Sequence, residues 1–402
     1  MEKILMIVVL LGATLKSGLG QNNPVDIDSG YFEVDGGRLF YEAGGKGENI
    51  VLLHDGMVSN EIWDLQFPLL AKYYRVIRYD RRGYGRSSDP GAPYSDIEDL
   101  NQLFVKLGIN NATLFGMSSG GGCTIDFTLK YPEKVNALVL VGAVVGGYGY
   151  TSHMTYRGGH LKNPEEMSDP GKAAEYFIWS DPYEIYSENT EAKKKVASIL
   201  ERTLHRSFDR RFYMPPERIA ARFLSEIKVP CLVLVGEYDI PDVHAHAGVI
   251  SFGIYGSRRE VIQNSGHLIP VERPVEFNKS VFRFLRRNDF FSILNLKGVD
   301  AASNYFNTFF TSEPRVMMFS ESEMNQLGYR YLQEGKIKES IRLFTLNVVS
   351  YPDSWNVYDS LGEALLKDGQ ISPAIKNYER SLAVNPDNEN AKKILSELKL
   401  KK

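Results

Sequence analysis

The feature that most constrains this chain is a G-x-S-x-G motif at residues 116–120, centred on Ser118. A short strand-like run, residues 111–115, precedes the motif, and residues 120–131 can form a helix that a following proline helps to end. The chain must turn sharply between strand and helix, and the glycines beside the serine permit that turn. The motif therefore predicts a nucleophile elbow. Ser118 would lie at the carboxyl end of a strand, and the N–H of Ser119 at a helix N-terminus, where it can bind developing negative charge.

A serine hydroxyl attacks a carbonyl only with the help of a base and an acid, and candidates for both follow strand-like runs later in the chain. The apolar run 229–235 is typical of a buried strand, and Asp239 follows it as the predicted acid. The run 259–262 resembles another strand, and the glycine-containing loop after it carries His267, the predicted base. The expected catalytic residues are Ser118, Asp239 and His267.

Other residues of the same types compete for these roles. Asp242 is the nearest rival of Asp239, but it lies at the start of the next helix, where a carboxylate ordinarily serves as a cap. Glu237 is still leaving the strand and is less free to reach a histidine. Of the seven histidines, only His267 follows the last strand of the expected sheet, and His54 is interpreted as a structural loop residue.

From about Tyr31 to Asp289 the chain resembles the α/β-hydrolase superfamily, especially its lid-bearing esterase, enol-lactone hydrolase and aminopeptidase-like branches. Besides the elbow and the order Ser, Asp, His, three further segments carry the resemblance: residues 50–56 (strand and H-G-x loop), 79–88 (D-x-R-G-x-G-x-S) and 131–135 (Y-P-x-x-V, leading into a strand over 135–144). The resemblance implies an α/β fold with a mostly parallel eight-stranded sheet and a helical lid.

One residue departs from the pattern of this branch. Asp55 stands where glycine is usual, in the loop that would supply the second N–H of an oxyanion hole. The backbone of Gly56 is the expected second donor beside Ser119, with Met57 as the alternative. The neighbouring pair Arg81 and Arg82 is interpreted as stiffening a loop by hydrogen bonds to backbone and carboxylates, rather than as an anion site.

Residues 1–20 are predicted to be a signal peptide. A positive start at Lys3 precedes an apolar run over 4–15, and small residues at 18–20 precede a cleavage site before Gln21. This pattern predicts an exported protein, periplasmic or secreted, with no stable membrane insertion after cleavage. An uncleaved membrane anchor is the alternative. The hydrolase domain would then span 21–290.

A long insertion over about 147–226 separates two expected strands and is interpreted as the lid. It is rich in aromatic residues and has helix-like periodicity over 171–180 and 191–208. In the family that the chain resembles, such lids cover the serine and choose the substrate.

The end of the chain repeats with a period of 34 residues. Seven positions of the first unit recur in the second. They are Met324, Leu327, Gly328, Tyr331, Ser340, Phe344 and Pro352, matched by Tyr358, Leu361, Gly362, Leu365, Ala374, Tyr378 and Pro386. The register resembles the tetratricopeptide repeat. We expect a helical linker over 291–322 and two such repeats plus a closing helix over 323–402, serving as a dock for a protein partner or as a buttress.

Composition narrows the remaining possibilities. With a net charge of −3 in 402 residues, no basic surface dominates and nucleic acid is not an expected partner. The two cysteines, Cys123 and Cys231, fall in a helix and a core strand and are expected to be buried free thiols. The spacing of histidines and cysteines matches no metal motif, and no cofactor is expected.

Two classes of function remain. The first is a serine hydrolase that cleaves a small ester, lactone or related acyl bond through an acyl-Ser118 intermediate. The second is a non-catalytic ligand-binding or interaction protein on a hydrolase scaffold, against which the complete triad argues. Within the first class, carbon–carbon bond hydrolysis, peroxidation and aminopeptidase activity stay open, since fold alone does not decide the reaction.

Overall fold

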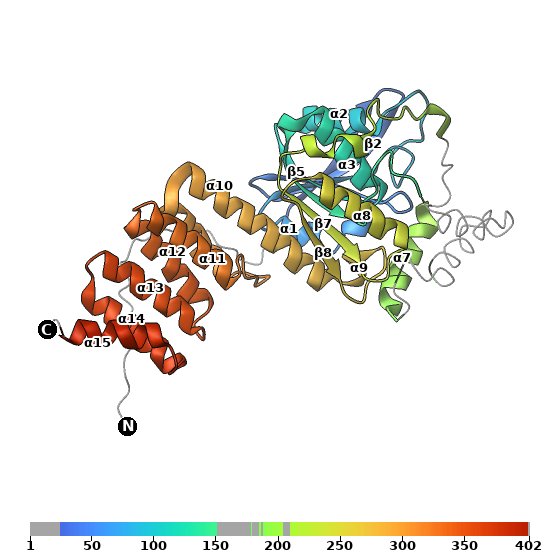
Figure 1. Ribbon diagram of the computed structural model, residues 1–402. Helices are drawn as coiled ribbons and strands as arrows, with labels where there is room; N and C mark the ends of the chain where they lie inside the picture. The colour runs from blue at the N-terminus through green and yellow to red at the C-terminus, as the bar shows by residue number, and fades with distance from the viewer. Residues whose placement is uncertain (1–24, 151–177, 179–184, 186–187, 204–209, 401–402) are drawn as a thin grey trace.

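The structure is a computed structural model that describes residues 25–150, 178, 185, 188–203 and 210–400. Two parts are visible, an α/β body and a C-terminal group of helices, and the long helix α10 joins them (Figure 1). The predicted signal peptide lies outside the described residues, and so does the expected lid helix at 171–180 except for residue 178.

The described residues of the body form one sheet of eight strands: β1 (Ile27–Val34), β2 (Gly37–Gly44), β3 (Asn49–Leu53), β4 (Arg75–Tyr79), β5 (Ala112–Met117), β6 (Val135–Val141), β7 (Cys231–Gly236) and β8 (Arg258–Ile262). Their spatial order is β1-β2-β4-β3-β5-β6-β7-β8. Strand β2 is antiparallel to both of its neighbours, and every pair from β4 to β8 is parallel. The predicted mostly parallel, eight-stranded α/β sheet is therefore confirmed.

Both faces of the central strands are buried, which explains their continuous apolar sequences. Successive side chains of a strand point to opposite faces, so Ile50 and Leu52 of β3 join one core while Val51 and Leu53 join the other. Helices α2, α3 and α8 supply the second core, and α1, α7, α9 and the first half of α10 supply the first. The sheet is thus the middle layer of three (Figure 1).

The helices of the body are α1 (Phe67–Leu70), α2 (Asp96–Leu107), α3 (Ser119–Lys130), α7 (Thr190–Thr203), α8 (Pro241–Gly253), α9 (Ile269–Glu272) and α10 (Pro274–Phe310). Short 3-10 helices are η1 (Asn60–Trp63), η2 (Pro132–Lys134), η4 (Arg210–Phe212), η5 (Ala220–Arg222) and η6 (Leu224–Glu226). Helix α10 is interrupted at Gly298, whose φ of 82° is not helical. None of the described helices is long and apolar enough to cross a membrane.

The prediction that the strand after the elbow helix extends to Val144 is wrong, because β6 ends at Val141. The chain turns at Gly142, whose φ is 52°. Its N–H donates to the carbonyl of Leu234 at 2.8 Å, so the neighbouring strand still holds the turn in place. Cys123 and Cys231 are free and buried, as predicted.

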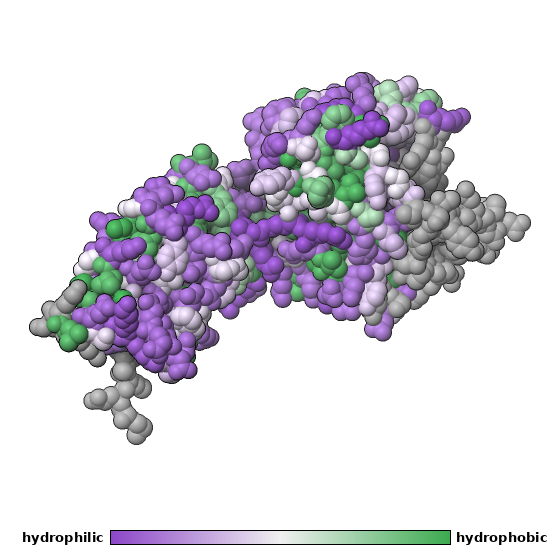
Figure 2. Space-filling view, in the orientation of Figure 1, coloured by the Kyte–Doolittle hydropathy of each residue, from purple (hydrophilic) through white to green (hydrophobic). Residues whose placement is uncertain are grey.

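The tail consists of α11 (Glu321–Gln333), α12 (Ile337–Ser350), α13 (Trp355–Lys367), α14 (Ile371–Val384) and α15 (Glu389–Leu400). A close contact between a glycine and an aromatic ring occurs in each of two helical hairpins of the tail. A Cβ at Gly328 would lie 2.5 Å from the ring of Phe344, and a Cβ at Gly362 would lie 3.1 Å from the ring of Tyr378. In each hairpin glycine lets an aromatic side chain approach the facing helix. The outer surface of these helices is mostly hydrophilic (Figure 2).

Helix α10 belongs to the cores of both parts. Phe277 and Phe282 pack in the body, whereas Phe290 and Phe306 pack with α11 and α12. Polar contacts add to this connection, since Glu323 of α11 pairs with Arg258 of β8 at 2.8 Å and with Arg287 of α10 at 2.9 Å. The residues expected to form a helical linker over 291–322 are thus helical to Phe310 and continue without a helix to Ser320.

Candidate active site

Ser118 lies at the sharp turn between β5 and α3, with φ 51° and ψ −115°. This conformation is rare for a residue with a side chain, and such strain is typical of functional sites. Two glycines make the turn possible, since a Cβ at Gly116 would lie 2.6 Å from the carbonyl oxygen of Gly120, and a Cβ at Gly120 would lie 2.4 Å from that of His54. The backbone N–H of Ser118 donates to Val141 of β6 at 2.9 Å. The turn is therefore held from both sides.

His267 and Asp239 meet beyond the carboxyl ends of β8 and β7. The Nδ1 of His267 lies 2.7 Å from Oδ2 of Asp239, and both side chains are buried. The second carboxylate oxygen of Asp239 accepts the N–H of Ile240 at 2.8 Å. A carboxylate in this position fixes the tautomer and the orientation of the ring.

The two rival carboxylates have different surroundings. Glu237 accepts the backbone N–H of Asn264 at 2.9 Å. Asp242 lies in the first turn of α8, and its side chain is buried there. Asp239 is therefore the carboxylate that contacts His267, whereas Glu237 supports the loop that follows β8.

Two residues that the sequence analysis did not single out shape the surroundings of His267. Glu272, in α9, accepts the N–H groups of Gly266 and Leu268 at 2.9 and 3.0 Å, so it holds the residues on both sides of the histidine. Gly142 lies against the ring itself, because a Cβ there would be 2.9 Å from Cε1 of His267 and 3.3 Å from Oδ2 of Asp239. Of these two residues, only Gly142 could have been singled out from the sequence, because it follows the apolar strand after the elbow helix.

Asp55 occupies the alternative of the two residues expected to supply the second oxyanion donor. The N–H of Met57, the alternative donor, is engaged by Oδ1 of Asp55 at 2.6 Å. Within the described part of the chain no hydrogen bond of the Gly56 N–H is found, which leaves it available beside the N–H of Ser119 in the first turn of α3. The Oδ2 of Asp55 lies 3.5 Å from Nε2 of His267.

His54 has the contacts of a structural residue. It is fully buried, its Nδ1 contacts the backbone oxygen of Asp55 at 2.6 Å, and its Nε2 accepts the N–H of Arg81 at 2.9 Å. Burial, together with the charge of Arg81, lowers the pKa of His54 to about 3. The imidazole is therefore a neutral link between two loops.

The arginine pair stiffens its loop, in agreement with the sequence interpretation. Arg82 makes a two-pronged pair with Asp99 at 2.9 and 2.7 Å. Arg81 donates to the backbone oxygen of Asp55 at 3.3 Å and to the hydroxyl of Ser119 at 2.8 Å. The side chain of Ser119 is thus held by a buried guanidinium, and its backbone N–H is the expected oxyanion donor.

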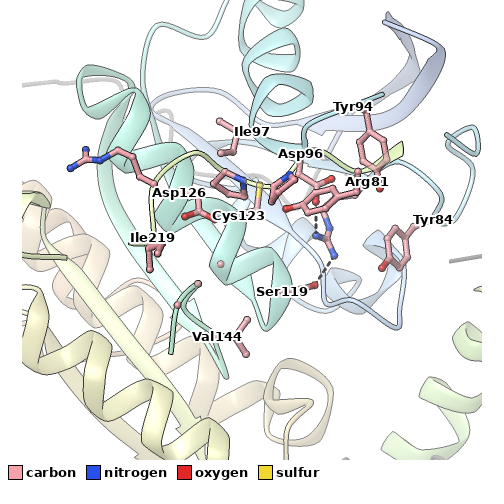
Figure 3. Close-up of a pocket in the computed structure, with 17 residues that line it drawn as sticks. Arg81, Tyr84, Tyr94, Asp96, Ile97, Ser119, Cys123, Asp126, Val144 and Ile219 are labelled. Carbon is pink, nitrogen blue, oxygen red and sulfur yellow. Dashed lines mark hydrogen bonds and ion pairs between the residues drawn. The ribbon is translucent and has the colours of Figure 1, made fainter. Parts of the chain in front are cut away.

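A cavity of about 440 Å³ lies beside the elbow, on the side of Ser119 (Figure 3). Its wall includes Arg81, Asp96, Cys123 and Asp126, and neither Ser118 nor His267 is part of it. Burial raises the pKa of Asp126 to about 7. The cavity adjoins the reacting groups without containing them.

Comparisons with known proteins agree with this geometry. The sequence profile described as "Alpha/beta hydrolase family" matches residues 50–280. The carboxylesterase YbfK of Bacillus subtilis (strain 168) is 24% identical over 274 residues, which cover 65% of this chain and 89% of that enzyme. A 2-hydroxy-6-oxononadienedioate/2-hydroxy-6-oxononatrienedioate hydrolase of Escherichia coli (strain K12) is 30% identical over 268 residues, 62% of this chain and 91% of that enzyme.

Among solved structures, that of Est816, described as an N-acyl homoserine lactone degrading enzyme, aligns with a TM-score of 0.51 at 25% identity. The alignment covers 63% of this chain and all of that one. All of these matches cover less than the whole of this chain, and the profile ends before the tail helices begin.

Proposed function

Because the chain belongs to the alpha/beta hydrolase family, we propose that it is a serine hydrolase that cleaves a small ester, lactone or related acyl bond through an acyl-Ser118 intermediate. The observation that carries the proposal is the pairing of His267 with Asp239 at 2.7 Å, in a site that also contains the strained Ser118. The esterase and lactone-degrading enzymes among the similar proteins support the same reaction class.

The proposed chemistry proceeds in two halves. The Nε2 of His267 takes the proton of Ser118 as its Oγ attacks the substrate carbonyl, and Asp239 stabilises the imidazolium that forms. The negative charge that develops on the carbonyl oxygen is bound by the N–H groups of Ser119 and Gly56. His267 then returns the proton to the leaving group. A water molecule, deprotonated by the same imidazole, releases the acyl group as an acid and restores the serine.

A second reaction on the same residues has a specific observation behind it. The relative from Escherichia coli is named as a hydrolase of 2-hydroxy-6-oxononadienedioate and 2-hydroxy-6-oxononatrienedioate, and it is 30% identical over 268 residues. Carbon–carbon bond cleavage is therefore the alternative reaction. Aminopeptidase activity and peroxidation use the same fold, and a non-catalytic binding protein is the alternative outside enzymes.

Two further proposals concern the ends of the chain. We propose export through cleavage before Gln21, supported by the apolar run at 4–15, and N-terminal sequencing of the protein from its host tests it. We also propose that the tail is a pair of tetratricopeptide-like repeats, supported by the recurring Gly328–Phe344 and Gly362–Tyr378 contacts. Such repeats serve as a dock for a protein partner or as a buttress.

The experiment for the main proposal is labelling with a fluorophosphonate, followed by peptide mapping and a panel of esters of graded chain length. We expect one labelled peptide containing Ser118, and turnover of at least one short ester. Labelling at another residue, or a folded protein that reacts with neither probe nor ester, contradicts the proposal. A dienedioate substrate turned over when every ester is refused would select carbon–carbon bond cleavage.

A further inference from the structure

A second carboxylate lies beside His267, opposite Asp239. Asp239 binds the Nδ1 side of the ring at 2.7 Å, while Oδ2 of Asp55 lies 3.5 Å from Nε2, the nitrogen that would accept the serine proton. The carboxylate of Asp55 therefore lies beside one of the reacting atoms, close to where the substrate carbonyl must bind.

This carboxylate is fixed in place and charged. Its Oδ1 accepts the N–H of Met57 at 2.6 Å, and only 4% of the residue is exposed. Burial by itself would raise the pKa of Asp55, but the hydrogen bonds from His267, Met57 and Ser118 and the charge of His267 lower it to about 2. A buried negative charge of this kind is stable only while it has a partner.

The neighbouring guanidinium does not serve as that partner. Arg81 donates to the backbone oxygen of Asp55, to the hydroxyl of Ser119 and, at 3.5 Å, to Asp96. Among the described residues, the side chain that forms an ion pair with Asp55 is His267, and it does so only while its imidazole is protonated.

The reaction starts without this partner. His267 must be neutral to accept the proton of Ser118, so before the reaction the buried carboxylate of Asp55 has no ion-pair partner among the described residues. The imidazolium restores the pair only as the oxyanion develops beside Gly56, the residue next to Asp55. A neutral ester therefore binds beside an unpaired buried charge, which costs free energy.

A positive charge on the substrate reverses this effect. We propose that Asp55 is a specificity residue that binds an ammonium group two or three bonds from the scissile carbonyl, so that the preferred substrates are aminoacyl esters or amides. The substrate ammonium pairs with the carboxylate of Asp55 while His267 is still neutral. This inference rests on the proposed function and names the substrate class of the same site.

The test compares the methyl esters of phenylalanine and of 3-phenylpropanoic acid, which share a carbon skeleton and differ by one ammonium group. Rates are measured at about pH 6.5, where the amine is largely protonated. We expect wild-type protein to prefer the aminoacyl ester. In Asp55→Asn, kcat/KM for that ester should fall by about 10- to 100-fold, because a charged hydrogen bond is lost, and kcat/KM for the neutral ester should change much less. The change in the ratio of the two rates between wild type and variant cancels the intrinsic reactivities of the two esters.

Asp126→Asn is the control, because it makes the same substitution at another aspartate near the elbow, in a cavity whose wall does not include His267. Its ratio of the two rates should equal that of the wild type, and a loss of preference in this variant instead of Asp55→Asn overturns the inference. Wild-type protein that hydrolyses the neutral ester as fast as the aminoacyl ester overturns it as well, even if Asp55→Asn does not fold. In both cases fluorophosphonate labelling of Ser118 still stands, whereas absence of labelling and of all turnover contradicts the proposed function itself.

Discussion

The body and the tail of this protein both use glycine to bring atoms close together, but for different purposes. In the body, Gly120 and Gly142 lie against a carbonyl oxygen and against the ring of His267. In the tail, Gly328 and Gly362 lie against the aromatic rings of Phe344 and Tyr378. The first pair makes room for a few polar atoms whose positions matter to a fraction of an ångström. The second pair makes room for apolar packing that recurs from one hairpin to the next.

The body and the tail also differ in backbone strain and in buried charge. The body contains the positive φ of Ser118 and the buried carboxylates Asp55 and Asp239, all near one edge of the sheet. Strain and buried charge cost stability, and they persist where the surrounding structure holds them for a purpose. The tail contains regular helices with apolar seams. Changes in the site should therefore affect rates first, and changes in the tail should affect stability first.

The largest expected effect is that of Ser118→Ala. If the triad acts as a unit, turnover of a small ester should fall by roughly four to six orders of magnitude, and fluorophosphonate labelling should disappear while the circular dichroism spectrum is kept. Ser119→Ala is the control and should be mild, since only the backbone N–H of Ser119 is needed. Labelling that survives in Ser118→Ala would show that another residue is the nucleophile.

Gly142→Ala should lower kcat/KM by about 100-fold, because displacing a catalytic group by an ångström has this order of effect. Its Cβ would lie 2.9 Å from Cε1 of His267. Gly108→Ala is the matched control, since its φ is 62° and a Cβ there meets no atom within 4 Å. Both variants carry the cost of a positive φ, so equal activities in the two would mean that His267 adjusts to the added methyl.

Truncation after Asn288 should separate the contribution of the body from that of the tail. Ester turnover should persist, because Ser118, Asp239 and His267 all lie upstream. The melting temperature should fall, since Arg286 loses the carbonyl partners Glu313 and Pro314 and apolar surface is exposed at about 25 cal/mol for each Å². A folded truncation that labels but does not turn over would mean that the tail shapes access to the site.

Gly328→Ala should destabilise the protein by about 1 to 3 kcal/mol through overpacking, with esterase activity unchanged. The added Cβ would come within 2.5 Å of the buried ring of Phe344, whereas in Gly362→Ala the contact with Tyr378 would be 3.1 Å. We therefore expect Gly362→Ala to be milder in thermal unfolding. A rate loss in Gly328→Ala without loss of stability would contradict the division between body and tail.

Replacing Asp126 has the smallest expected effect, and the size of that effect depends on pH. Burial raises the pKa of Asp126 to about 7, above the value of about 3.9 for an unfolded aspartate. The folded state therefore binds the extra proton, and the unfolding free energy falls as pH rises between these two values. Asp126→Asn should be more stable than wild type at pH 8 and nearly equal at pH 4. Equal stability at both values would mean that Asp126 is solvated.

Much of the body could be predicted because parallel strands, and the loops that follow them, can be recognised from short stretches of sequence. The runs before Ser118 and before Asp239 are apolar and short, and they became β5 and β7 within two residues of the expected bounds. The end of β6 was missed, because the turn at Gly142 is held by a hydrogen bond to the carbonyl of Leu234, which is distant in sequence. The role of Glu272 was missed for the same reason, since its two hydrogen bonds are made to a loop whose path only the folded chain defines.

The sequence by itself determined the order of strands and helices, the strained turn at Ser118 and the period of the tail, because these follow from local sterics and from the spacing of apolar residues. Tertiary structure decided which charges meet. Asp239 rather than Asp242 reaches His267, and Asp55, which looked like a change in a backbone loop, places its carboxylate against the opposite ring nitrogen. The physical reason is that electrostatic interactions act through distance and burial, and neither is specified until strands far apart in the chain lie side by side in one sheet.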